Sequence, residues 1–84
     1  MFKNRYAGNR NNICGIKIAR LRKAIRPKVS QRELADRLQI IGLDIDKNAV
    51  QRIESGHRFV TDIELDAIAR VFDVSVDVLL DDKR

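Results

Sequence analysis

The sequence lacks several residue types and patterns, and each absence removes a class of protein from consideration. Only one of its 84 residues is cysteine, Cys14, so neither an intramolecular disulfide nor a zinc cluster built on several cysteines can form. A single cysteine also favours a reducing compartment, and we expect a cytoplasmic protein. Residues 1–12 contain no apolar segment, and apolar runs elsewhere are only a few residues long. We therefore expect neither a signal peptide nor a membrane-spanning helix.

Residues that commonly carry catalysis are also scarce. The chain has one histidine, His57, one cysteine, and no glycine-rich phosphate loop. Ser30 and Thr61 stand where their hydroxyls are expected to cap helices, so no arrangement of serine, histidine and acid is indicated. We expect neither an enzyme, a cofactor, a metal site nor a small-molecule ligand.

Acidic residues are absent from the first 32 positions, which hold ten lysines and arginines. Residues 33–84 hold seven basic residues and all twelve acids, and the net charge is +5. A folded domain with one cationic end favours a polyanion such as nucleic acid as its partner. The alternative is that these charges serve solubility alone.

A chain of this length forms one small domain. Residues 1–12 include four asparagines and one glycine and show no periodic apolar pattern, so we expect a flexible basic arm over 1–12 and a folded domain over 13–84. The arm either has no function of its own or contacts phosphates or a minor groove of DNA.

Apolar periodicity and capping residues predict five helices and no strand. A first helix over 13–26 is followed by Pro27, which a helix avoids. Ser30-x-x-Glu33 and Thr61-x-x-Glu64 are capping boxes that open the second and fourth helices, and the second is expected to end near residue 38 or 39.

The third helix is predicted from an Asp46 cap to a left-handed stop at Gly56. Before it lies a connector over 39–45, which Gly42 interrupts and whose aliphatic residues are expected to tuck one or two side chains under the turn. A short fifth helix starts at Ser75. Its apolar residues either close the core or form a contact between two copies: Val76, Leu79 and Leu80.

The third helix has the pattern of an element that reads DNA. Val50 and Ile53 are spaced to anchor it to the domain, while four polar residues lie toward its outer face: Lys47, Asn48, Gln51 and Arg52. Arginine can bind both guanine acceptors, and asparagine can bind adenine, from the major groove. Ala49 is small enough to allow close approach or to touch a thymine methyl group. The alternative for each polar residue is an ordinary solvated surface.

Four further residues are predicted to contact the DNA backbone. Gln31 and Arg32 stand at the start of the second helix, where free amide groups favour an anion. His57 and Arg58 follow the third helix and could hold a phosphate on its other side. Such contacts set the register of the reading helix without reading sequence.

Together these segments resemble the Cro and phage-repressor helix-turn-helix family, also called the XRE family. The matching segments are Ile18-x-x-Leu21-Arg22, Ser30-Gln31-x-Glu33-Leu34-Ala35-x-x-Leu38, Val50-x-Arg52-Ile53-Glu54-x-Gly56, and Ile68-Ala69-x-x-Phe72-x-Val74-Ser75-Val76-Asp77-x-Leu79-Leu80. They cover about three quarters of the chain.

The resemblance implies an all-α, compact, five-helix, lambda-repressor-like domain from a prokaryote or phage, with its second and third helices as the reading unit. It places base contacts at Lys47, Asn48 and Arg52, with Gln51 near the backbone or a neighbouring base. It also pairs Arg22 with Glu54. The connector between the second and third helices departs from the family pattern, because it is longer than the usual tight turn.

We therefore expect a transcriptional regulator, most simply a repressor, that binds a pseudo-palindromic operator in double-stranded DNA as a homodimer. The alternative is a protein-binding adaptor, antirepressor or antitoxin-type module that uses the same fold. The cationic first 32 residues and the polar outer face of the third helix favour DNA over a protein partner.

Overall fold

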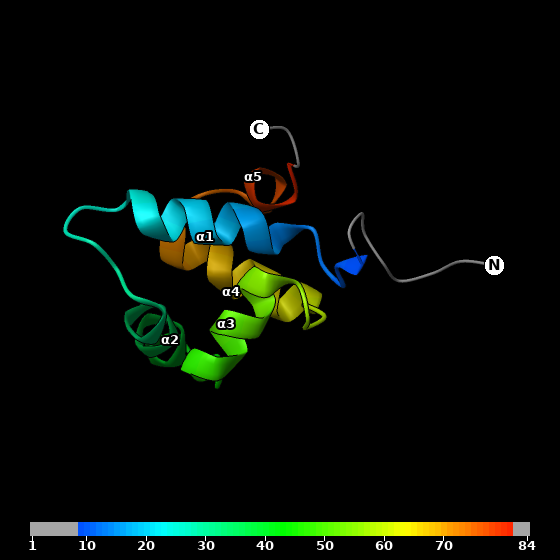
Figure 1. The fold of residues 1–84 in the computed structure, drawn as a ribbon. Helices are drawn as coiled ribbons and strands as arrows, with labels where there is room; N and C mark the ends of the chain where they lie inside the picture. The colour runs from blue at the N-terminus through cyan, green and yellow to red at the C-terminus, as the bar shows by residue number, and fades with distance from the viewer. Residues whose placement is uncertain (1–8, 82–84) are drawn as a thin grey trace.

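A computed structural model describes residues 9–81, and over that range the chain forms five helices and no strand. The helices are α1 (Cys14–Ala24), α2 (Gln31–Ile40), α3 (Lys47–Ser55), α4 (Asp62–Phe72) and α5 (Val76–Leu80). Figure 1 shows α2 and α3 at one end of the domain and α5 at the other, with α1 and α4 between them. The predicted all-α, five-helix class is confirmed. None of the helices within 9–81 is long and apolar enough to cross a membrane.

Both predicted capping boxes are present. The Ser30 hydroxyl accepts a hydrogen bond from the Glu33 backbone at 3.0 Å, and the Glu33 carboxylate accepts one from the Ser30 backbone at 2.9 Å. Thr61 and Glu64 repeat this exchange at 3.2 and 3.0 Å. The hydrogen bond from the Ser30 backbone to the Glu33 carboxylate holds the pKa of Glu33 below its usual value, and the Ser30 side chain adds to this shift. The starts of α2 and α4 are therefore fixed by local sequence.

Helix α1 is shorter than predicted. It ends at Ala24, because Ile25 already has an extended conformation with ψ 138°. The expected end at Arg26 is wrong by two residues, since the chain leaves the helix before it reaches the restricted position ahead of Pro27. Helix α2 continues to Ile40, just beyond its expected end.

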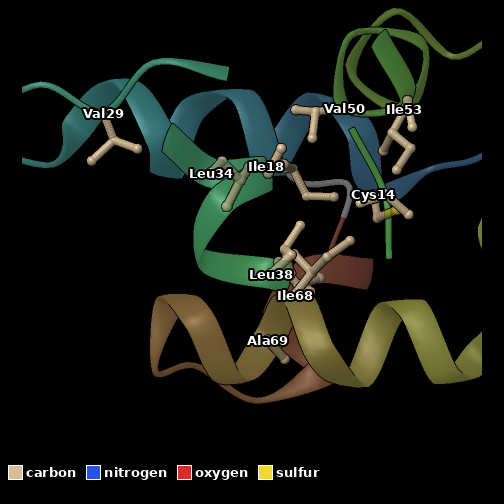
Figure 2. Packing of buried hydrophobic residues seen from close by; sticks show 13 residues of the cluster. Cys14, Ile18, Val29, Leu34, Leu38, Val50, Ile53, Ile68 and Ala69 are labelled. Carbon is tan, nitrogen blue, oxygen red and sulfur yellow. The ribbon is translucent and has the colours of Figure 1, made fainter. Parts of the chain in front are cut away.

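The core lies where α1, α2, α3 and α4 meet, as the side chains in Figure 2 show. Val50 and Ile53, the predicted anchors of α3, are both buried. Leu79 of α5 is fully buried, so α5 closes the core, whereas Leu80 beside it stays exposed. The buried apolar residues are Cys14, Ile18, Val29, Leu34, Ala35, Leu38, Ile45, Ala49, Val50, Ile53, Ile68, Ala69 and Leu79.

The connector between α2 and α3 is held at both of its ends. Gly42 adopts a positive φ of 100°, and the chain turns there as the Leu43 N–H donates to the Leu38 carbonyl at 2.9 Å. Ile45 is buried under the turn, and the Gln39 side chain donates to its carbonyl at 2.8 Å. Ile41 instead stays exposed. The longer connector therefore anchors the start of α3 through one buried isoleucine.

Most of the arm predicted over 1–12 falls on residues 1–8, which lie outside the described residues. Its last residues do contact the domain. Arg10, Asn11 and Asn12 donate hydrogen bonds to backbone carbonyls at and just after the end of α3. A segment rich in asparagine thus becomes part of the packing around α3, because its amide groups find partners there.

Gly15 sets how closely α1 approaches α3. A Cβ atom at this position would overlap the Ile53 carbonyl oxygen, with Asn12 Oδ1 only 2.8 Å away. We predict that Gly15→Ala lowers the free energy of unfolding by about 1–3 kcal/mol, because the two helices must separate. Urea denaturation followed by circular dichroism measures this loss. Lys23→Ala, on the exposed side of α1, is the control and should change stability by less than about 0.5 kcal/mol. Equal effects of the two variants would contradict the close approach.

Candidate nucleic-acid interface

Helix α3 is fixed at both ends and along one side. Asp46 caps its start by accepting from the Ala49 backbone at 2.8 Å, and Gly56 ends it with a left-handed φ of 89°. Val50 and Ile53 bury the inner side. The orientation of α3 about its own axis is therefore set by packing.

The four predicted base-contacting residues lie together on the opposite side. Lys47, Asn48, Gln51 and Arg52 are all exposed, and positions three and four apart on a helix are neighbours on its surface. No hydrogen bond or ion pair within 9–81 uses their side chains, so their polar groups are free to bind another molecule. The connector does not cover Lys47 or Asn48.

Ala49 does not belong to this face. It was expected to allow close approach to DNA, but only 5% of its surface is exposed and it packs in the core. This expectation is wrong because Ala49 lies beside Val50 on the inward side of α3, where a small side chain permits tight packing.

The start of α2 lies next to the start of α3. A groove of about 680 Å³ runs between them and brings Arg32 and Lys47, from two different helices, to one opening. Its lining residues are Arg22, Lys28, Val29, Ser30, Gln31, Arg32, Glu33 and Lys47. Arg32 is exposed, as its predicted contact with the DNA backbone requires. The groove therefore combines basic side chains with the free amide groups of a helix start.

Glu54 holds the three helices around this groove. Arg22 of α1 donates twice to its carboxylate, at 2.7 and 3.0 Å, and Gln31 of α2 donates to it at 2.9 Å. The Arg22 and Glu54 side chains are only 9% and 8% exposed. Hydrogen bonding to Glu54 raises the pKa of Arg22 above its ordinary value, although burial opposes this shift. The pair implied by the family resemblance is present.

Gln31 was predicted to contact the DNA backbone, and its side chain is already partly used. Its amide nitrogen donates one hydrogen bond to Glu54. An amide group has two N–H donors, so one remains for an outside acceptor. A phosphate contact by Gln31 stays a prediction, and the structure adds a second role that ties α2 to α3.

His57 and Arg58 follow α3 and have different surroundings. His57 is exposed, and its Nδ1 lies 2.8 Å from the Ser55 hydroxyl. Arg58 forms two hydrogen bonds to the Glu64 carboxylate, at 2.9 and 3.0 Å. Burial alone would raise the pKa of Glu64, but the bonds from Arg58 and the Thr61 backbone outweigh it and lower the pKa. Phosphate contacts by both residues stay predictions, and Arg58 would reach a phosphate only while sharing its charge with Glu64.

Catalytic and metal chemistry finds little support among residues 9–81. No group of three or more histidine, cysteine and acidic side chains is placed to hold a metal ion in that range. Cys14 is buried, and burial raises its thiol pKa to about 11, so the reactive thiolate is scarce at neutral pH.

A comparison with models of protein families gives a match. The family model described as helix-turn-helix matches residues 18–79, which is most of the chain. No match was found among the curated proteins or among the solved structures. The matched region contains α2, α3, the connector between them, and the Arg22–Glu54 pair.

The buried pair gives a stability prediction. Glu54→Ala leaves the Arg22 charge buried without its carboxylate, and we expect the free energy of unfolding to fall by about 3–5 kcal/mol. Asp66→Ala is the matched control, because it removes the exposed ion pair between Asp66 and Arg70 in α4. The control should lose less than about 1 kcal/mol. Chemical denaturation of both variants measures the difference, and similar losses would show that the Glu54 carboxylate does not hold the helices together.

Proposed function

The chain belongs to the helix-turn-helix family, in its Cro and phage-repressor type, and on that basis we propose that it is a transcriptional repressor that binds specific double-stranded DNA sequences. The observation that carries the proposal is the outer face of α3. Four polar side chains lie there, exposed and without partners in the described chain, while the other side of the helix is buried.

In this proposal α3 lies in the major groove. An α-helix with its side chains is about 10–12 Å wide, and the groove is about 12 Å wide. Arg52 binds the two acceptors of guanine, and Asn48 binds the acceptor and donor of adenine. Lys47 and Gln51 contact neighbouring bases or the backbone. The exposure of these residues on one side of a rigid helix supports the assignment.

Backbone contacts in this proposal come from two places on either side of α3. Arg32 and the start of α2 bind one phosphate, and the loop with His57 binds another on the far side of α3. These contacts hold the register while α3 reads bases.

A nine-residue helix contacts only a few base pairs, so we propose that two copies bind a pseudo-palindromic site. The burial of Leu79 means that α5 offers a partner copy only its exposed residues, chiefly Val78 and Leu80.

A protein partner is the second candidate, because large aliphatic side chains are exposed on α2, on the connector and on α4. Ile40 is 83% exposed and Ile63 is 73% exposed. Ile63 and Ile41 line a cleft of about 160 Å³ between the connector and α4. Large exposed aliphatic residues beside a cleft are typical of protein contact sites. An adaptor of this kind would not require the free polar face of α3.

The two candidates are separated by selection of bound fragments from a pool of random DNA. We expect enrichment of one sequence with two inverted half-sites about 34 Å apart, because two reading helices would lie one helical turn from each other. Sequencing of the bound fraction measures both the sequence and its symmetry. A bound pool as random as the input would contradict the proposed function and favour the protein-binding alternative.

Arg52 provides the test of base reading. We expect Arg52→Ala to weaken binding to the selected site by about 1–3 kcal/mol, while binding to a scrambled duplex changes little. Fluorescence anisotropy at one fixed salt concentration measures both. Arg70→Ala on α4 is the control, because it removes an equal charge from an exposed arginine outside α3. Equal losses on the two duplexes would make Arg52 a backbone contact instead.

A further inference from the structure

The end of α3 is completed by residues that lie more than forty positions earlier in the chain. The last carbonyl groups of a helix have no partner within it and need one from elsewhere. Here the N–H groups of Gly56, His57 and Arg58 turn back to the Arg52 carbonyl, and that of Gly56 also to Ile53. Residues 10–12 donate to the next carbonyls, those of Ile53 and Glu54. We call residues 10–12 the N-terminal strap.

Hydrogen bonds from the strap reach five carbonyls around the end of α3. Arg10 Nη2 donates to the Glu54 carbonyl at 2.8 Å. The Asn11 backbone donates to Gly56 at 2.8 Å, and its side chain to His57 at 3.0 Å. Asn12 Nδ2 donates to Ile53 at 3.0 Å and to Arg58 at 2.8 Å. The strap therefore holds both the last turn of α3 and the start of the following loop.

Asn12 joins this turn to α1. Its side chain is buried, its amide nitrogen makes the two bonds to α3 and the loop, and its Oδ1 accepts from the Gly15 backbone at 2.8 Å. Both N–H groups and the oxygen are thus in use. A movement of the end of α3 away from α1 would break the buried bond from Asn12 to the Ile53 carbonyl, so Asn12 couples this end of α3 to α1.

Arg10 adds a charge to the same place. Its guanidinium lies directly over Gly56, where a Cβ atom would come within 2.8 Å of it. A positive group at the carboxyl end of a helix is favourable, because the free carbonyls there carry partial negative charge. Arg10 therefore holds the turn of α3 that contains Arg52.

We propose that Arg10 is a positioning residue for DNA reading and acts through Arg52. This inference rests on the proposed function. The strap binds the carbonyls of Ile53 and Glu54, the two residues that directly follow Arg52. Helix ends fray, whereas a two-bond contact to guanine requires donors within about 3.2 Å and well aligned. A held last turn keeps the Arg52 backbone where its side chain meets the base.

The test compares Arg10→Ala with Arg20→Ala, which removes an equal charge from an exposed position on α1. Binding to the selected site and to a scrambled duplex is measured by fluorescence anisotropy, at a temperature where circular dichroism shows each variant to be folded. We expect Arg10→Ala to weaken specific binding about fivefold, the effect of losing one helix-end interaction. Binding to the scrambled duplex should change no more than with Arg20→Ala. Arg10→Lys, which retains the charge and a donor, should recover part of the loss.

A double-mutant cycle shows whether Arg10 acts through Arg52. In the Arg52→Ala background, Arg10→Ala should change specific binding by less than about twofold, because the contact that it positions is gone. If Arg10 has only a structural role, Arg10→Ala will lower thermal stability and leave selectivity unchanged. That result would overturn the inference. Equal losses on both duplexes beyond those of Arg20→Ala would identify Arg10 as a backbone contact and also overturn it. If the unaltered protein shows no selectivity, the proposed function itself fails, and the inference fails with it.

Discussion

The carboxylate of Glu54 accepts hydrogen bonds from α1 and α2 while it belongs to α3, and the candidate interface depends on this junction. Arg22 provides two of the bonds and also donates to the Val29 carbonyl at 3.0 Å, in the segment that leads into α2. A buried ion pair contributes little net stability over a well-packed apolar pair, but it allows few alternative geometries once formed. The pair therefore acts mainly as an orienting contact, which fixes the angle at which α3 meets its neighbours.

The outer face of α3 follows from that orientation. Successive residues of a helix are rotated by about 100°, so the burial of Val50 and Ile53 decides which residues face outward. The longer connector does not disturb this arrangement. Ile45 is buried and Asp46 caps the helix directly after it, so the extra residues bulge outward before α3 begins. The exposed Ile41 lies in that bulge.

Local signals in the sequence predicted much of the fold. The capping boxes at Ser30 and Thr61 and the left-handed stop at Gly56 are short-range patterns, and each is present. The exposed face of α3 followed from helical spacing. Ala49 was misplaced because it lies at the border of the inward side, where spacing alone leaves its direction open. The contacts of Asn11 and Asn12 span more than forty residues, so no local pattern reveals them. The Arg58 pair with Glu64 spans only six residues, but it joins a loop to α4, so neither helical spacing nor a capping pattern indicates it.

The strap also determines which residues must be moved together when this domain is transplanted into another protein. The family match begins at residue 18, whereas the bonds that complete α3 begin at Arg10. A chimera that transplanted only residues 18–79 into another scaffold would carry the whole signature of the family. It would nevertheless lack the strap, so the carbonyls of Glu54 and Gly56 would lose their donors in the protein and bond only to water. A segment transplanted with all of these bonds must therefore begin at Arg10 or earlier.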